Sequence, residues 1–131
     1  MSQAQVHKKF IFNEKIDDAY LYDLYANDYT YIAEVFANSI ETLKDESRVL
    51  ASAFDASNLT DLKKAAHKIK PLFGFTGLLH HQDSVLHFEQ LCEKVSGTVN
   101  VTMQYMELIE EIKEGRNILK EDYNRLTQFL S

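Results

Sequence analysis

Apolar side chains recur at steps of three and four residues along most of this chain, which is the spacing that gives a helix one buried face. The longest such run predicts a helix over residues 29–54. Its buried stripe is expected to consist of Ile32, Phe36, Ser39, Leu43, Ser47, Leu50 and Phe54. No run of residues shows the strict alternation of a β-strand, so the pattern indicates an all-α protein.

Shorter helices are expected on either side of this long one. A first helix is predicted over residues 17–26, and its apolar side is expected to carry Ile16, Tyr20 and Leu24. Asn58 is a good N-cap for the helix that follows the long one, because its side chain accepts hydrogen bonds from free amides. This helix should end near Gly77. Its inner face is expected to consist of Leu62, Ala65, Ala66, Ile69, Phe73 and Thr76.

Two more helices complete the chain. The first is expected to begin at Gln82 or Asp83, after a turn, and its inward residues are Val85, Phe88, Cys92 and Val95. The last is expected over residues 101–130, with a stripe of Leu108, Ile112, Leu119 and Leu126. Gly115 interrupts this last helix and weakens it by about 1 kcal/mol relative to alanine. A kink and a division into two helices at that glycine are both open, and so is an unbroken helix, whose ~30 residues would reach ~45 Å.

Together these patterns predict an antiparallel up-down four-helix bundle with a short additional N-terminal helix. A chain of 131 residues can bury one core, so the bundle is expected to form a single domain over residues 16–131. Residues 1–15 are expected to be an N-terminal arm, held to the body by Phe10, Ile11 and Phe12.

Charge and composition narrow the classes of function. The net charge of −6 argues against a general nucleic-acid binder, which needs a basic surface. Residues 59–70, however, hold four lysines against one aspartate, and this local charge of +3 suggests a site for an anionic partner. Cys92 is the only cysteine, so no intrachain disulfide is possible. Without a signal peptide or an apolar run of ~20 residues, we expect a cytoplasmic protein that does not enter a membrane. We also expect the protein to be a monomer.

The basic segment contains a histidine, His67, in a position suited to nucleophilic chemistry. On a helical wheel, His67 falls about 140° from Leu62, toward water. Its helix neighbours are Lys63, Lys70, Pro71 and Gly74. A neutral imidazole nitrogen is nucleophilic, and the ordinary histidine pKa of ~6.5 leaves the ring mostly neutral at cellular pH. The site is therefore suited to receive a phosphoryl group, whose charge Lys70 and Lys63 would stabilise.

The position of the next helix, which returns alongside, predicts a partner for the ring of His67. If the connection centres near Leu78, then residues eleven before and eleven after it lie level. These are His67 and Glu89, so Glu89 or the adjacent Gln90 is expected to hydrogen-bond the far ring nitrogen and orient the ring. Pro71 removes the amide that would bond to the carbonyl of His67, which predicts a bend that tips this turn outward.

At these residues the chain resembles a histidine-containing phosphotransfer (HPt) domain. The family pattern is a histidine, any residue, an aliphatic residue, a lysine and usually a glycine, with a further glycine ten positions after the histidine. The matching residues are His67, Ile69, Lys70 and Gly77. Pro71 replaces the first glycine, and Glu89, with Gln90 beside it, stands where the family often has glutamine. Helix order and size agree from about Ile16 onward.

The resemblance implies a phosphorelay intermediate of two-component signal transduction, without kinase activity of its own. It would accept a phosphoryl group on His67 from an aspartate of a receiver domain and pass it to another receiver domain, with Lys70 stabilising the phosphate. The implied partners are response-regulator receiver domains and a hybrid histidine kinase. No cofactor is expected, because Mg²⁺ would belong to the receiver. Docking of the partner is expected at Lys63, Pro71, Gly74, Gly77, Tyr20 and Tyr25.

Two other functions stay open on the sequence alone. A bundle of this kind can bind receivers without carrying phosphate, although the presence of both His67 and Lys70 speaks against this. A metal-binding helical bundle would use the group of His80, His81, Asp83 and His87. That group lacks a second histidine four residues from His87, so solvated side chains at a helix turn are favoured over a metal site. The tyrosines between residues 20 and 31 either close the end of the bundle or form a docking surface.

Overall fold

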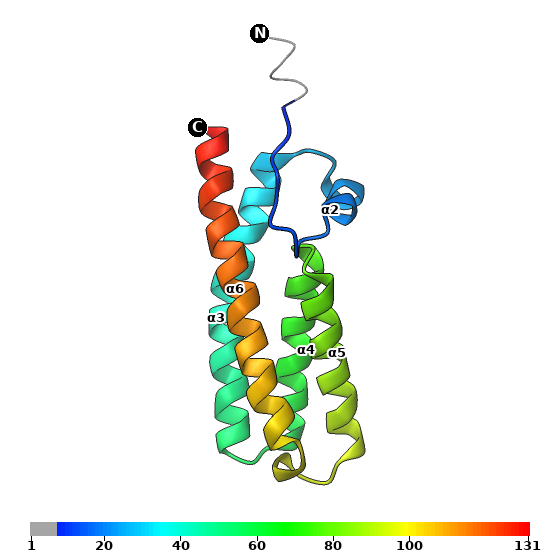
Figure 1. The fold of residues 1–131 in the computed structure, drawn as a ribbon. Helices are drawn as coiled ribbons and strands as arrows, with labels where there is room; N and C mark the ends of the chain where they lie inside the picture. Colours follow the sequence, from blue (N-terminus) through cyan, green and yellow to red (C-terminus); the bar gives the residue numbers. More distant parts are fainter. Residues whose placement is uncertain (1–7) are drawn as a thin grey trace.

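Every regular element in the part of the chain that the structure describes is helical. The computed structural model describes residues 8–131, and its elements are α2 (Asp18–Tyr25), α3 (Tyr29–Asp55), α4 (Leu59–Phe75), α5 (Leu79–Lys94), the short 3₁₀ helix η1 (Thr98–Val101) and α6 (Thr102–Leu130). The four long helices stand side by side and α2 lies across one end of them (Figure 1). The predicted fold class, a four-helix bundle with a short N-terminal helix, is confirmed.

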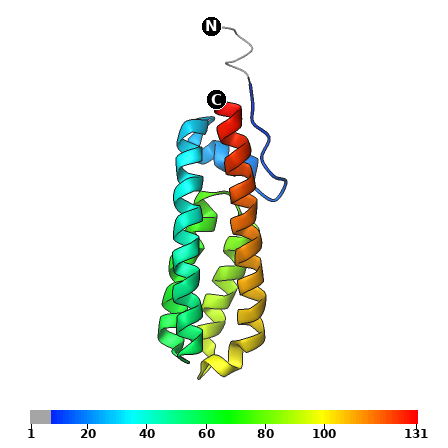
Figure 2. The ribbon, with the colours of Figure 1, turned by 90° about the vertical axis from the view of Figure 1, so that its left-hand side faces the viewer.

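The long helices pack in a cycle around one core. α3 contacts α4, α4 contacts α5, α5 contacts α6, and α6 returns to α3. Figure 2 shows the side of the bundle that α3 and α6 form, with α4 and α5 behind them. The pair α4 and α5, which carries the candidate site, therefore lies on the opposite side of the molecule.

The predicted stripes supply this core. In α3, Ile32, Phe36, Leu43 and Leu50 are buried with Ser39, whereas Ser47 and Phe54 are only half-buried. The inner face predicted for α4 is buried throughout, and so is the stripe predicted for α6. Within residues 8–131, no helix is both long enough and apolar enough to cross a membrane.

Polar caps and one glycine fix the ends of the helices. The side chain of Asn58 accepts a hydrogen bond from the amide of Asp61 at 3.0 Å, so the predicted N-cap of α4 is confirmed. Gly77 follows α4 with a φ of +77°, in the left-handed region that favours glycine. Its carbonyl accepts from the amide of Asp17 at 2.9 Å, which ties the start of α2 to the α4–α5 turn.

The buried side of α2 differs from the prediction. Leu21 is its buried residue, at 1% exposed, whereas Leu24 is 46% exposed and Tyr20 is half-buried. The reason is that Leu21 and Ile16 pack against Gly77, within 3.1 Å of where a Cβ would lie. A helix of eight residues is too short for its periodicity alone to choose its buried face.

The segment before α2 is pinned across the end of the bundle. Phe10 and Phe12 are buried as expected, but Ile11 is 76% exposed because the extended backbone points it outward. Asp122 of α6 accepts from the amide of Asn13 at 2.6 Å, and Arg125 donates to the carbonyl of Ile11 at 2.7 Å. Residues 1–7 of the predicted arm lie outside the described residues.

The structure corrects the predicted start of α5 and decides whether α6 divides. α5 begins at Leu79, not at Gln82 or Asp83, and its N-cap residue Leu78 provides no side-chain hydrogen bond. α6 runs without interruption through Gly115, so the helix does not divide there. A Cβ on Gly115 would lie 2.6 Å from Cε1 of Phe73, so the glycine leaves room for the ring of Phe73 against α6.

Candidate functional site

The ring of His67 projects from the outer side of α4. Its side chain is 67% exposed, while the neighbouring Ala66 and Ile69 are fully buried in the core. The helical wheel therefore places the ring correctly. Because Ala66 and Ile69 anchor this turn of the helix, the ring is presented to solvent from a rigid position.

A carboxylate from α5 contacts this ring. Oε2 of Glu89 lies 2.7 Å from Nδ1 of His67, and Oε1 of the same carboxylate accepts from Nζ of Lys70 at 2.8 Å. Glu89 is 8% exposed, so its carboxylate contacts protein groups more than water. Gln90 is exposed and its side chain makes no hydrogen bond within residues 8–131, so of the two residues predicted to orient the ring only Glu89 contacts it.

The electrostatics of Glu89 decide the tautomer of the ring. Burial raises the pKa of this carboxyl group, but hydrogen bonds from Lys70 and His67, together with their charges, bring the pKa below its ordinary value. Glu89 is therefore ionised at neutral pH and can only accept hydrogen bonds. Nδ1 of His67 must be the donor, which leaves the lone pair on Nε2, the nitrogen with no hydrogen bond within the described residues.

A second lysine lies one turn earlier on α4. Lys63 forms an ion pair with Glu93 at 2.8 Å, and this hydrogen bond raises the pKa of Lys63. Glu93 is not among the predicted site residues, although the register that sets residue 67 beside 89 also sets 63 beside 93. Cys92, next to Glu93 in sequence, is buried, and burial raises the pKa of its thiol to about 11, so it is a neutral core residue.

Two of the predicted docking residues are not available to a partner. Gly74 is buried beneath the side chain of Gln82, and Gly77 is buried against Ile16 and Leu21. Both predictions are wrong as surface contacts, because these glycines permit close packing inside the molecule. Pro71 is half-buried within α4, which continues to Phe75; the bend predicted at this proline stays a prediction.

The tyrosines of α2 lie against the end of α4. Tyr20 and Tyr25 are both half-buried, and the hydroxyl of Tyr25 donates to the carbonyl of Phe75 at 2.8 Å. Burial, and then the nearby Tyr31 and Tyr20, raise the pKa of Tyr25. The ring of Phe75 is itself 53% exposed, so this end of α4 presents an apolar surface beside α2. Tyr25 thus fixes α2 to α4 whether or not it contacts a partner.

The histidines at the start of α5 differ from one another. His81 is 1% exposed, so the expectation of a solvated ring is wrong for this residue. Its Nε2 lies 2.9 Å from Oε1 of Glu114, and Oε2 of Glu114 binds Lys15 at 2.9 Å. His80 and His87 are exposed. Residues 8–131 contain no group of three or more histidine, cysteine or acidic side chains arranged to hold a metal ion.

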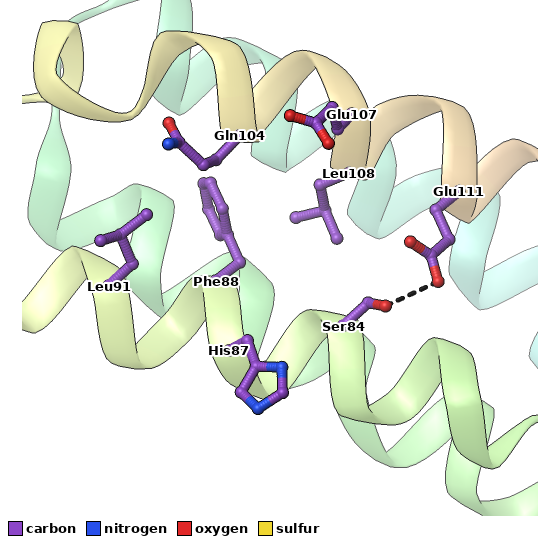
Figure 3. A pocket seen from close by; sticks show the side chains of 8 residues that line it. All are labelled: Ser84, His87, Phe88, Leu91, Gln104, Glu107, Leu108 and Glu111. Atoms are coloured by element: carbon purple, nitrogen blue, oxygen red, sulfur yellow. Dashed lines mark hydrogen bonds between the residues drawn. The ribbon is translucent and has the colours of Figure 1, made fainter.

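A hollow of about 240 Å³ lies between α5 and α6. Phe88 and Leu108 form its apolar floor, and the hydroxyl of Ser84 donates to Glu111 at 2.6 Å at one edge (Figure 3). None of the predicted site residues lines it. The hollow therefore belongs to a different surface from the one that carries His67.

Comparison with known proteins identifies the fold. No protein-family model matches the sequence, and no curated protein is significantly similar to it. The structure is similar to the crystal structure of the HPt domain from a sensor hybrid histidine kinase of Shewanella, with a TM-score of 0.73 and 11% sequence identity. The match covers 85% of this chain and 95% of that one. The chain has the fold of an HPt domain.

Proposed function

We propose that this protein is a phosphorelay intermediate that carries a phosphoryl group on Nε2 of His67. The observation that carries the proposal is the pairing of Nδ1 with the buried carboxylate of Glu89 at 2.7 Å, on a ring that is 67% exposed. This arrangement leaves a nucleophilic nitrogen in solvent, where the active site of another protein can reach it.

The transfer itself needs little from this chain. Nε2 attacks the phosphorus of an aspartyl phosphate on a receiver domain, the new N–P bond forms as the O–P bond breaks, and the aspartate leaves as a carboxylate. Imidazole attacks through a lone pair, so no additional base is required. The receiver supplies Mg²⁺ and the in-line geometry, and this chain has no kinase activity of its own.

Lys70 is the proposed stabiliser of the transferred group. Its side chain is 24% exposed, and its ammonium group is held at 2.8 Å from Oε1 of Glu89, the carboxylate that also binds the ring. An ammonium group fixed beside the ring can form charge-assisted hydrogen bonds with phosphoryl oxygens. Lys63, engaged by Glu93, adds positive charge on the same side of α4.

Receiver domains and a hybrid histidine kinase are the proposed partners. The docking surface consists of the exposed part of α4 around His67 and the adjoining end of α2, where Tyr20 and Tyr25 lie. The exposed ring of Phe75 extends this surface. Such an interface is expected to be moderate in area and transient, since the carrier must leave one receiver before it meets the next.

Phosphoryl transfer from a receiver tests the proposal directly. A radiolabelled receiver domain is incubated with the protein, and label is expected on the wild type in an acid-labile form. His67→Gln should take no label, whereas His87→Gln, which alters another exposed histidine, should be labelled like the wild type. If the wild type binds phosphorylated receivers but never takes up label, the protein is an interaction module and the proposal is wrong.

A further inference from the structure

Glu89 places a full negative charge beside the ring of His67. A neutral amide side chain at the same position could make the same hydrogen bond without that charge. Its two oxygens are divided between Nδ1 of His67, at 2.7 Å, and Nζ of Lys70, at 2.8 Å. The carboxylate is 8% exposed, so bulk water does little to screen its interaction with the ring proton. An amide would accept the proton of Nδ1 equally well in geometry but would hold it less strongly.

We propose that Glu89 sets the lifetime of the phosphoryl group on His67 by keeping the proton on Nδ1 throughout the transfer cycle. The inference rests on the proposed function, because it concerns the phosphorylated form of the same histidine. Glu89 acts through the ring and does not touch the phosphorus, so it is a positioning residue.

The chemistry of the leaving group explains the effect. When Nε2 takes the phosphoryl group, the ring carries a positive charge for as long as Nδ1 keeps its proton. When the Nε2–P bond breaks, either to a receiver aspartate or to water, the bonding electrons return to the ring. A ring protonated at Nδ1 leaves as neutral imidazole, whereas a ring without that proton must leave as imidazolate, a much poorer leaving group. Glu89 therefore makes the phosphoryl group easier to pass on and shorter-lived in water.

Other charged and titratable groups face the pair from α4 and α5. From α4, Lys70 is bound to Glu89, and Lys63 is paired with Glu93 of α5, which raises the pKa of Lys63. Cys92, also from α5, stays neutral because burial raises its pKa to about 11. Among these groups, Glu89 is the one whose charge lies in direct contact with Nδ1 of His67.

The decay of phosphohistidine in Glu89→Gln tests the inference. The wild type, Glu89→Gln and Glu93→Gln are phosphorylated with the small donor phosphoramidate, so that no receiver is needed, and loss of the phosphoryl group is followed at several pH values. Near and above neutral pH, Glu89→Gln should keep its phosphoryl group roughly tenfold longer than the wild type, as expected for loss of one adjacent charge. Glu93→Gln makes the same change of charge one helical turn away, at a side chain bound to Lys63, and should decay nearly like the wild type.

The pH at which decay slows gives a second readout, and Glu93→Gln is expected to keep the midpoint of the wild type. Its midpoint should be higher in the wild type than in Glu89→Gln, and higher than in Nε2-phosphohistidine free in solution, a comparison that does not require the variant to fold. Equal midpoints, or a shorter lifetime in Glu89→Gln, overturn the role of Glu89 and leave the carrier function standing. A wild type that takes no phosphoryl group from either phosphoramidate or a receiver overturns both.

Discussion

The molecule contains two histidines with nearly the same polar partners in opposite surroundings. His67 pairs with Glu89, which also binds Lys70, and His81 pairs with Glu114, which also binds Lys15. The first ring is 67% exposed, and the second is 1% exposed between Phe73 and Gly115. Each histidine therefore belongs to a histidine–glutamate–lysine group, yet only one of the two rings can be reached by another protein.

The two rings also differ in which nitrogen the glutamate leaves unbound. Glu89 binds Nδ1 of His67 and leaves Nε2 toward solvent. Glu114 instead binds Nε2 of His81, whose Nδ1 is buried and has no hydrogen-bond partner within residues 8–131. A buried nitrogen cannot approach phosphorus on another protein, so His81 contributes packing and not transfer. Access and the choice of free nitrogen, more than the presence of a carboxylate and a lysine, distinguish the proposed acceptor His67 from the core residue His81.

The largest expected effect separates the two rings by their chemistry. His67→Ala should abolish phosphoryl uptake, because the proposed acceptor is gone. His81→Ala should still be labelled when it is assayed below its melting temperature, and His81→Phe, which keeps a ring in the core, provides a second variant. The measurement is acid-labile label per folded protein. Label lost in the His81 variants and kept in His67→Ala would reverse the assignment.

The same two alanine variants should differ in stability in the opposite sense. His81→Ala removes a fully buried ring and leaves a cavity, so we expect a loss of about 3 kcal/mol in the free energy of unfolding. His67→Ala removes an exposed ring and should cost less than about 1 kcal/mol. Urea denaturation followed by circular dichroism measures both. Equal losses would mean that the two rings do not differ in burial in solution.

The contact that buries His81 can be tested at Gly115. Alanine there would favour the helix by about 1 kcal/mol on propensity alone. Its Cβ, however, would lie 2.6 Å from Phe73 and 3.0 Å from His81, so a net destabilisation of about 1–2 kcal/mol is expected. Gly97→Ala is the control, since its Cβ would meet nothing closer than 3.9 Å and its φ is extended. A Gly115→Ala protein more stable than the wild type would contradict the close contact of Gly115 with the rings of Phe73 and His81.

The smallest expected effect concerns pH. The pKa of Glu89 is lowered in the folded protein, so its contribution to stability is present above the ordinary value of 4.5 and is lost as the pH falls through the lowered folded value. Glu89→Gln should therefore be about 1 kcal/mol less stable than the wild type at neutral pH, with the gap closing in acid. Glu114, whose side chain is 48% exposed, should show a smaller gap in Glu114→Gln. A gap for Glu89 that is unchanged in acid would show that charge is not its source.

Local patterns were sufficient to predict the bundle and the placement of His67. The stripes of α3, α4 and α6 are long enough for their periodicity to identify the buried face, and the antiparallel return of α5 sets Glu89 level with His67. The same register also sets Lys63 beside Glu93, so this ion pair is predictable from the sequence as well.

Features that depend on distant segments were not predictable in this way. The burial of His81 follows from Gly115, which lies on another helix and permits close packing there. The start of α5 was misplaced because Leu78 caps it without a polar side chain, while Gln82 and Asp83 look like a helix start. Gly77 matches a family pattern, which predicts a docking contact at the surface. Its left-handed backbone and its packing against α2 place it in the interior instead.

The position of the phosphoryl group tests the central claim most directly. The protein is labelled with ¹⁵N at histidine, phosphorylated by a receiver domain, and examined by ³¹P and ¹⁵N nuclear magnetic resonance. We expect one phosphoryl group per chain, bonded to Nε2 of His67. A phosphoryl group on Nδ1, on another histidine, or on no histidine at all would contradict the account.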